Sequence, residues 1–112
     1  MNPLEIEICD TPEKRALGLQ FRASLPPDRI LHFVGRIYHS YEFFHMRNVR
    51  FPIAIAALDK AGKVLSLERI EPETGLFSPP RGTDSVVEMH VDFPAKHGVE
   101  KGKPFPAVLS PP

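Results

Sequence analysis

The sequence predicts a mainly β fold: a small single-domain β-sandwich or distorted barrel of about six or seven strands, with one short helix near residues 12–20. Three observations predict it. Thirteen prolines among 112 residues interrupt helices and favour short elements joined by turns. Several segments alternate apolar and polar residues with the period of two that a half-buried strand requires. The length suits a single hydrophobic core, so residues 1–112 are predicted to form one domain.

The first predicted strand covers Leu4–Cys9, and its alternation places Cys9 on the charged face with the glutamates. A single cysteine excludes an intrachain disulfide. The short helix should follow at once. Thr11 can cap it, Pro12 suits its first position, and Glu13 favours the positive end of the helix dipole.

The middle of the chain predicts four strands. Arg29–Val34 and Tyr41–Met46 are the first two. The strongest local signal is a β-hairpin, in which Pro52–Leu58 and Lys63–Ile70 flank the turn sequence Asp-Lys-Ala-Gly at 59–62.

The C-terminal part is rich in turn residues. Pro72–Thr83 contains three prolines and two glycines, which predicts a surface loop. A strand over Ser85–Val91 and a turn over His97–Gly102 are expected next. Pro104–Leu109 could form a last strand, and its prolines would confine it to a sheet edge.

Charge and composition narrow the class of protein. Fourteen basic residues balance 14 acidic ones, so no overall field attracts nucleic acid or anionic lipid. The N-terminal segment lacks the features of a signal peptide, and no apolar run is long enough to span a membrane. We therefore expect a cytoplasmic protein without membrane contact, a monomer or homodimer, whose partner is an unknown small molecule or protein. No nucleotide-binding motif occurs, and no cofactor is predicted.

Residues 29–51 combine arginines with aromatic residues. On an exposed sheet face such a segment can bind nucleic acid weakly. The competing interpretation is that the rings supply the core of a domain without tryptophan, while the arginines point to solvent on the opposite pleat. We favour the second interpretation.

Glu88 and His90 are the candidate catalytic residues. They lie two apart in a predicted strand, so both side chains leave the same face. If that face lines a cavity, the pair could act as acid and base in a small hydrolase or isomerase; if it faces water, the pair is an ordinary polar surface. Further metal ligands cannot be assigned, so no metal site is predicted.

The densest polar cluster is His45–Pro52. Arg47 offers a planar set of donors for a carboxylate or phosphate, and Asn48 tolerates turn conformations, so a small polar, anionic or sugar-like ligand could bind here. The alternative is structural: Asn48 satisfies loop backbone groups, and Arg47 pairs with Glu42 or Glu88.

Two motifs of the chain have a recognisable order of residues. Residues 11–22 (TPEKRALGLQFR), followed by Leu25, resemble Glu-Arg-x-x-Gly-Leu-Met-x-Arg followed by Leu. Residues 44–55 (FHMRNVRFPIAI) resemble Phe-Trp-Met-Lys-Asn-Thr-x-Ile-Pro-Leu-Asp-Ile. Both patterns resemble signatures of the domain of unknown function 192 family, an uncharacterised bacterial and archaeal family. The resemblance extends over about positions 5 to 103 and implies a compact β-sandwich with no established reaction.

The resemblance also implies a pocket built from the positions of Arg15, Arg22, Met46, Arg47, Asn48 and Glu88. The chain departs from the family pattern at four positions: His45 replaces Trp, Val49 replaces Thr, and Ala54 and Lys103 each replace Asp. If the family site needs that Thr and Asp, this chain has lost the site or uses His45 and Glu88 instead. We therefore expect a non-catalytic binding domain with ligand-binding residues Arg15, Arg22, His45, Arg47, Asn48 and Glu88.

Overall fold

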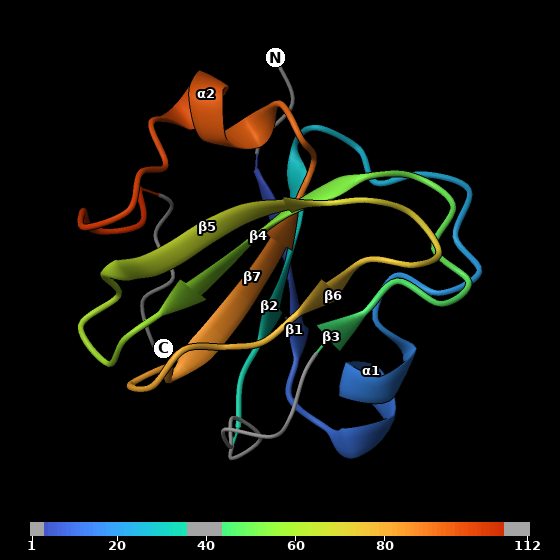
Figure 1. The fold of residues 1–112 in the computed structure, drawn as a ribbon, viewed down its shortest axis with the longest axis horizontal. Coiled ribbons are helices and arrows are strands. Elements are labelled where there is room, and N and C mark those ends of the chain that lie inside the picture. Colours follow the sequence, from blue (N-terminus) through green and yellow to red (C-terminus); the bar gives the residue numbers. More distant parts are fainter. Residues whose placement is uncertain (1–3, 36–43, 107–112) are drawn as a thin grey trace.

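The computed structural model describes residues 4–35 and 44–106, which form seven strands in two sheets and two short helices (Figure 1). The larger sheet has the order β1-β2-β7-β4-β5. Its strands are β1 (Glu5–Cys9), β2 (Arg29–Phe33), β7 (Ser85–Met89), β4 (Ile53–Leu58) and β5 (Val64–Ile70). The smaller sheet pairs β3 (Phe44–His45) with β6 (Leu76–Phe77), and the helices are α1 (Pro12–Leu17) and α2 (Phe93–His97). The predicted mainly β class is confirmed as a distorted sandwich, because the larger sheet does not close into a barrel.

β7 is the central strand of the larger sheet. It pairs antiparallel with β2 on one side and with β4 on the other, so Glu88 lies opposite both Leu31 and Ile55. β1 pairs parallel with β2 and forms one edge of the sheet, while β5 forms the other. The sheet order therefore puts Glu88 in the middle of the fold.

The two faces of the larger sheet are covered by different layers. The ribbon shows α1, β3 and β6 together on one side of the sheet and α2 on the other (Figure 1). Alternation along β7 sends Val86 into the first layer and Val87 and Met89 into the second. Phe77 of β6 packs in the first cluster and Phe93 of α2 in the second. Because both faces are covered, all residues of β4 and β7 are buried.

The predicted short helix is confirmed and ends at Leu17. The side-chain oxygen of Thr11 accepts a hydrogen bond of 3.1 Å from the backbone N–H of Lys14, and Pro12 occupies the first turn. These contacts satisfy a backbone donor that has no partner within the helix. The same residues begin the wall of a cavity described below.

The predicted hairpin is also confirmed. β4 and β5 pair antiparallel, and the Asp59 carboxylate accepts hydrogen bonds of 2.9 Å from the backbone N–H groups of both Ala61 and Lys63. Gly62 has φ +85°, a conformation that glycine adopts without the strain other residues incur. These turn contacts explain why the hairpin could be predicted from the sequence.

Cys9 shares a face of β1 with Glu7, as predicted, but at Cys9 this face is buried rather than turned to solvent. Its side chain is 2% exposed and belongs to the core, whereas Ile8, expected to face the core, is 43% exposed. The face of β1 that carries Glu7 and Cys9 lies beneath the chain after α1, where Arg22 pairs with Glu7. Burial raises the pKa of the Cys9 thiol to about 11, with smaller contributions from Glu7 and Glu88, so the thiol is protonated at neutral pH.

Other elements differ in their bounds. The predicted loop at 72–83 contains the two-residue strand β6, and the helix α2 precedes the turn predicted at 97–102. Of the strand predicted at 104–109, the structure describes one bridge, from Pro104 to Lys63, and residues 107–109 lie outside the described ranges. Residues 41–43 of another predicted strand also lie outside them. None of the helices described here has the length and apolar character needed to cross a membrane.

Candidate functional site

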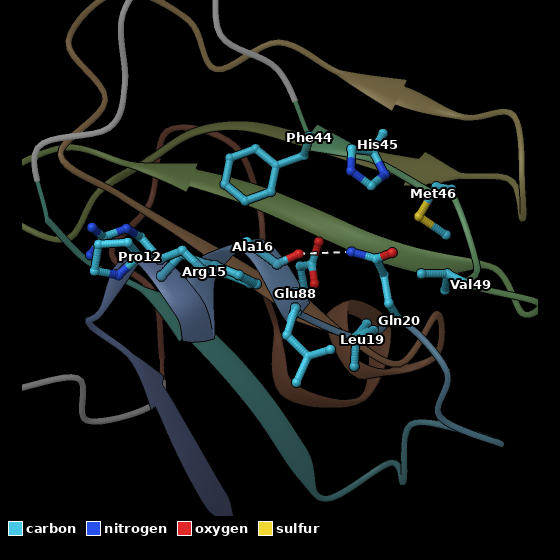
Figure 2. Close-up of a pocket in the computed structure, with 13 residues that line it drawn as sticks. Pro12, Arg15, Ala16, Leu19, Gln20, Phe44, His45, Met46, Val49 and Glu88 are labelled. Carbon is cyan, nitrogen blue, oxygen red and sulfur yellow. Dashed lines mark hydrogen bonds between the residues drawn. The ribbon is translucent and has the colours of Figure 1, made fainter.

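A cavity of about 460 Å³ lies between α1, β3 and the centre of the larger sheet (Figure 2). One wall comes from Pro12 and residues 15–20, and the opposite wall from residues 44–46 and Val49. Phe33 of β2 and Glu88 of β7 complete the lining. The volume falls within the roughly 300–1,000 Å³ typical of small-molecule sites, and most of the lining side chains are apolar.

Glu88 is the buried polar group of this cavity. Its side chain is 5% exposed, and its carboxyl lies between the two walls (Figure 2). Within residues 4–35 and 44–106 it has no hydrogen bond or ion pair. The Glu88 oxygens are not among the described side-chain atoms that are buried without a partner, so the carboxyl opens on the cavity, where a molecule inside it can bond to it.

Burial raises the pKa of Glu88 to about 8, and the positive charge of Arg22 lowers it only in part. Arg22 is already engaged: its guanidinium donates two hydrogen bonds to the Glu7 carboxylate, one of them 3.0 Å long. That pairing lowers the pKa of Glu7. Glu88 is therefore largely protonated at neutral pH and can ionise when its surroundings change.

His45 contributes a hydrogen-bond donor to the cavity lining. Its Nδ1 accepts a hydrogen bond of 3.1 Å from the backbone N–H of Arg47. Because Nδ1 is the acceptor, the neutral ring carries its proton on Nε2. His45 is half-buried and lines the cavity, so this N–H is available to a ligand.

Asn48 connects the two walls. Its side-chain amide donates a hydrogen bond of 3.0 Å to Oε1 of Gln20, and its backbone carbonyl oxygen accepts one of 3.0 Å from the backbone N–H of Phe21. Gln20 in turn donates to the carbonyl oxygen of Ala16 at 2.7 Å, the bond drawn in Figure 2. Asn48 has φ +62°, which asparagine tolerates better than most residues. It therefore acts on the cavity by positioning Gln20.

Arg15 lies at one end of the cavity. Its Nη1 donates a hydrogen bond of 2.9 Å to the carbonyl oxygen of Val34. A Cβ at Gly35 would lie 2.7 Å from the same nitrogen, so glycine at this position leaves room for the guanidinium. Figure 2 shows the Arg15 side chain directed toward Pro12 and away from Glu88.

The structure brings together part of the predicted set. Arg15, His45 and Glu88 line the cavity, whereas Arg22 and Asn48 lie behind its walls and Arg47 is exposed. The structural alternative for Arg47 included pairing with Glu88, which the structure does not show. Sequence reasoning did not select Gln20, Phe33 or Phe44 as site residues. Gln20 stands four residues after Ala16 in the first family-like motif, and this position was the available signal.

His90 is not brought to the cavity. β7 ends at Met89, and the Nδ1 of His90 accepts a hydrogen bond of 3.0 Å from the backbone N–H of Asp92. The same nitrogen lies 3.7 Å from an oxygen of the Asp92 carboxylate. The regular alternation that would have aligned His90 with Glu88 therefore stops one residue too early.

The aromatic and basic groups of residues 29–51 are largely engaged where the structure describes them. The rings of Phe33 and Phe44 pack edge to face, with centroids 5.2 Å apart, and both line the cavity. Arg29 pairs with Glu5 at 2.7 Å and Arg50 with Glu73 at 3.6 Å. Across residues 4–35 and 44–106, no three His, Cys, Asp or Glu side chains lie close enough together to hold a metal ion.

Comparisons with known proteins support the fold. The model of the DUF192 family, described as an uncharacterized ACR, matches residues 1–106. A protein of unknown function from Novosphingobium aromaticivorans DSM 12444 has a TM-score of 0.78 and 22% identity, over 90% of this chain and 73% of that one. A proposed transcription regulator from Sinorhizobium meliloti 1021 has a TM-score of 0.80 and 20% identity, over 90% and 79%. At these identities the two structures show a shared fold alone. A search of curated proteins found no match.

Proposed function

The chain belongs to the domain of unknown function 192 family, and we propose that it is a non-catalytic domain whose cavity binds a small molecule with an apolar body and one polar head. The observation that carries this proposal is Glu88, a nearly fully buried carboxyl that lines the cavity and has no partner in the described chain. Because this carboxyl opens on the cavity and has no partner among the described residues, the polar head of a ligand can bond to it without displacing a protein contact.

The remaining lining divides into two kinds of contact. Leu19, Met46 and Val49 offer apolar surface, whose burial against a ligand supplies most of the binding free energy. His45 and Gln20 are the polar neighbours of Glu88 and would orient the ligand head. This combination of broad apolar walls and few polar groups is typical of small-molecule sites.

A fragment screen by protein NMR tests the proposal. We expect fragments to shift resonances of residues 15–20 and 44–49, and we expect Ala16→Phe, which fills the cavity from α1, to weaken their binding at least tenfold. Ala95→Phe is the matched control, because Ala95 is exposed on α2 across the sheet. Fragments that bind elsewhere, or that bind both variants equally well, would contradict a ligand site in this cavity.

Acid–base catalysis at Glu88 is the second candidate function. The observation that favours it is the pKa of about 8, since a group that titrates near neutral pH is suited to proton transfer. His45, which lines the cavity, is then better placed than His90 to assist. Turnover of a bound ligand that Glu88→Gln abolishes while binding persists is the expected result. Turnover that survives the substitution would exclude this role.

A further inference from the structure

Among residues 4–35 and 44–106, no cationic side chain contacts Glu88. Arg22 is held by Glu7, and the Cys9 thiol, with its pKa raised to about 11, is neutral. From the opposite walls, His45 offers an N–H, while Arg15 donates to the backbone at the far end of the cavity. The charge that would complete this site is therefore positive, and no described residue provides it in contact with Glu88.

Two aromatic rings, those of Phe33 and Phe44, line the same cavity as the Glu88 carboxyl. Phe33 and Phe44 meet at an interplanar angle of 85°, so they present differently oriented faces and edges to their surroundings. Phe44 also packs edge to face with Phe77, which fixes its ring. The electron-rich face of an aromatic ring attracts cations within about 6 Å of its centre. The soft, polarisable thioether of Met46 lies on the same wall.

We infer that the ligand of this cavity is a small organic cation whose ammonium pairs with Glu88 beside the rings of Phe33 and Phe44. Its apolar body lies against Leu19, Met46 and Val49. This inference rests on the proposed function and names its ligand class.

Anionic and neutral ligands fit these contacts less well. An anion would keep Glu88 protonated and would meet ring faces whose quadrupole repels negative charge. A neutral alcohol can bond to the carboxyl and gains nothing from the rings beyond apolar contact. An ammonium gains from both, because it converts a protonated buried acid into a paired carboxylate.

Binding of a cation moves a proton. At pH 7 Glu88 is mostly protonated, since its pKa is about 8. When the ammonium binds, the carboxyl O–H proton passes to the buffer and the carboxylate accepts a hydrogen bond from the ammonium. No covalent bond in the ligand changes. The net release approaches one proton for each ligand bound, whereas an alcohol or an anion releases none.

Isothermal titration calorimetry with benzylamine, benzyl alcohol and benzoate at pH 7, in two buffers of different ionisation enthalpy, tests the inference. We expect benzylamine to bind at least tenfold more tightly than the other two and to release close to one proton. Glu88→Gln should weaken benzylamine at least tenfold and abolish the release while sparing benzyl alcohol. Glu68→Gln is the control, because it removes an exposed carboxylate from β5.

Phe44→Leu provides a second test that leaves the carboxyl in place. We expect it to reduce the preference for benzylamine over benzyl alcohol several-fold. Equal affinity for benzylamine and either of the other probes, or benzylamine binding without proton release, overturns the cationic ligand and leaves the proposed function standing. If none of the three probes binds while other fragments occupy the cavity, the cationic ligand is likewise overturned and the proposed function stands. A screen in which nothing binds the cavity overturns both.

Discussion

At the scale of the residue, Glu88 links stability to pH. Its pKa in the folded protein is about 8, above the usual value of 4.5. Between these values the folded state binds more protons than the unfolded state, so this group makes the protein less stable as pH rises from about 4.5 to 8. The effect is opposite in sign to that of Glu7, whose pKa is lowered.

Glu88→Gln should remove this dependence. Relative to the variant, the free energy of unfolding of the unmodified protein should fall by roughly 3 kcal/mol between pH 5 and pH 8. Urea unfolding at several pH values measures the difference, and Glu68→Gln serves as the exposed control. Parallel profiles for the protein and its Glu88→Gln variant would show that Glu88 titrates normally.

His32 should make the folded protein less stable at acidic pH. It is 8% exposed, its Nε2 has no hydrogen-bond partner, and burial lowers its pKa below 6.5 despite the opposing charge of Asp84. The unfolded state then binds the proton first, so the stability that His32 contributes is present above about pH 6.5 and is lost as pH falls below it. Thermal melts from pH 7.5 to 5.5 should show a smaller acid loss for His32→Phe, whereas the exposed His97→Gln should behave as the unmodified protein. An unchanged acid loss in His32→Phe would contradict the prediction.

At the scale of the element, a side-chain hydrogen bond from Asn48 to Gln20 joins the segments that form the two cavity walls. Asn48→Gly removes this hydrogen bond, and glycine readily adopts the positive φ of residue 48. The substitution therefore tests the hydrogen bond without adding backbone strain. A double-mutant cycle with Gln20→Ala should give a coupling of about 1 kcal/mol in the free energy of unfolding. Asn48→Gly combined with Asp59→Ala, in the distant hairpin, should be additive. A coupling near zero in the first cycle would mean that the walls are held together by other contacts.

Elements with strong local chemistry were predictable. Thr11 and Pro12 indicated the start of α1, and the turn at 59–62 indicated the hairpin. β6 has two residues and α2 only five, and such short elements depend on neighbours that the local pattern does not show. The period of β1 was correct, but its buried face was not. β1 is an edge strand that is partly covered on both faces, so the alternation of its residues does not show which face is the more buried one.

At the scale of the whole molecule, the candidate site was only partly predictable because it is built from distant segments. The residue patterns selected Glu88 and the polar cluster that contains His45, whereas Arg15 came from the family resemblance. Their meeting depends on the sheet order, which places β7 beside β2 and leaves the α1 segment over Glu88. Phe33 and Phe44 were assigned to the core, and the structure shows that core residues can also line a cavity. No local periodicity carries that information.

The parallel pairing of β1 and β2 has a kinetic consequence. Parallel neighbours need a long crossover, and here the crossover contains α1 and one whole wall of the cavity. The cavity is therefore complete only once this non-local pairing has formed. If the pairing is absent from the transition state for folding, a bound ligand should slow the unfolding rate and leave the folding rate unchanged, which stopped-flow kinetics with and without ligand would measure. Ligand binding would then lengthen the lifetime of the native state.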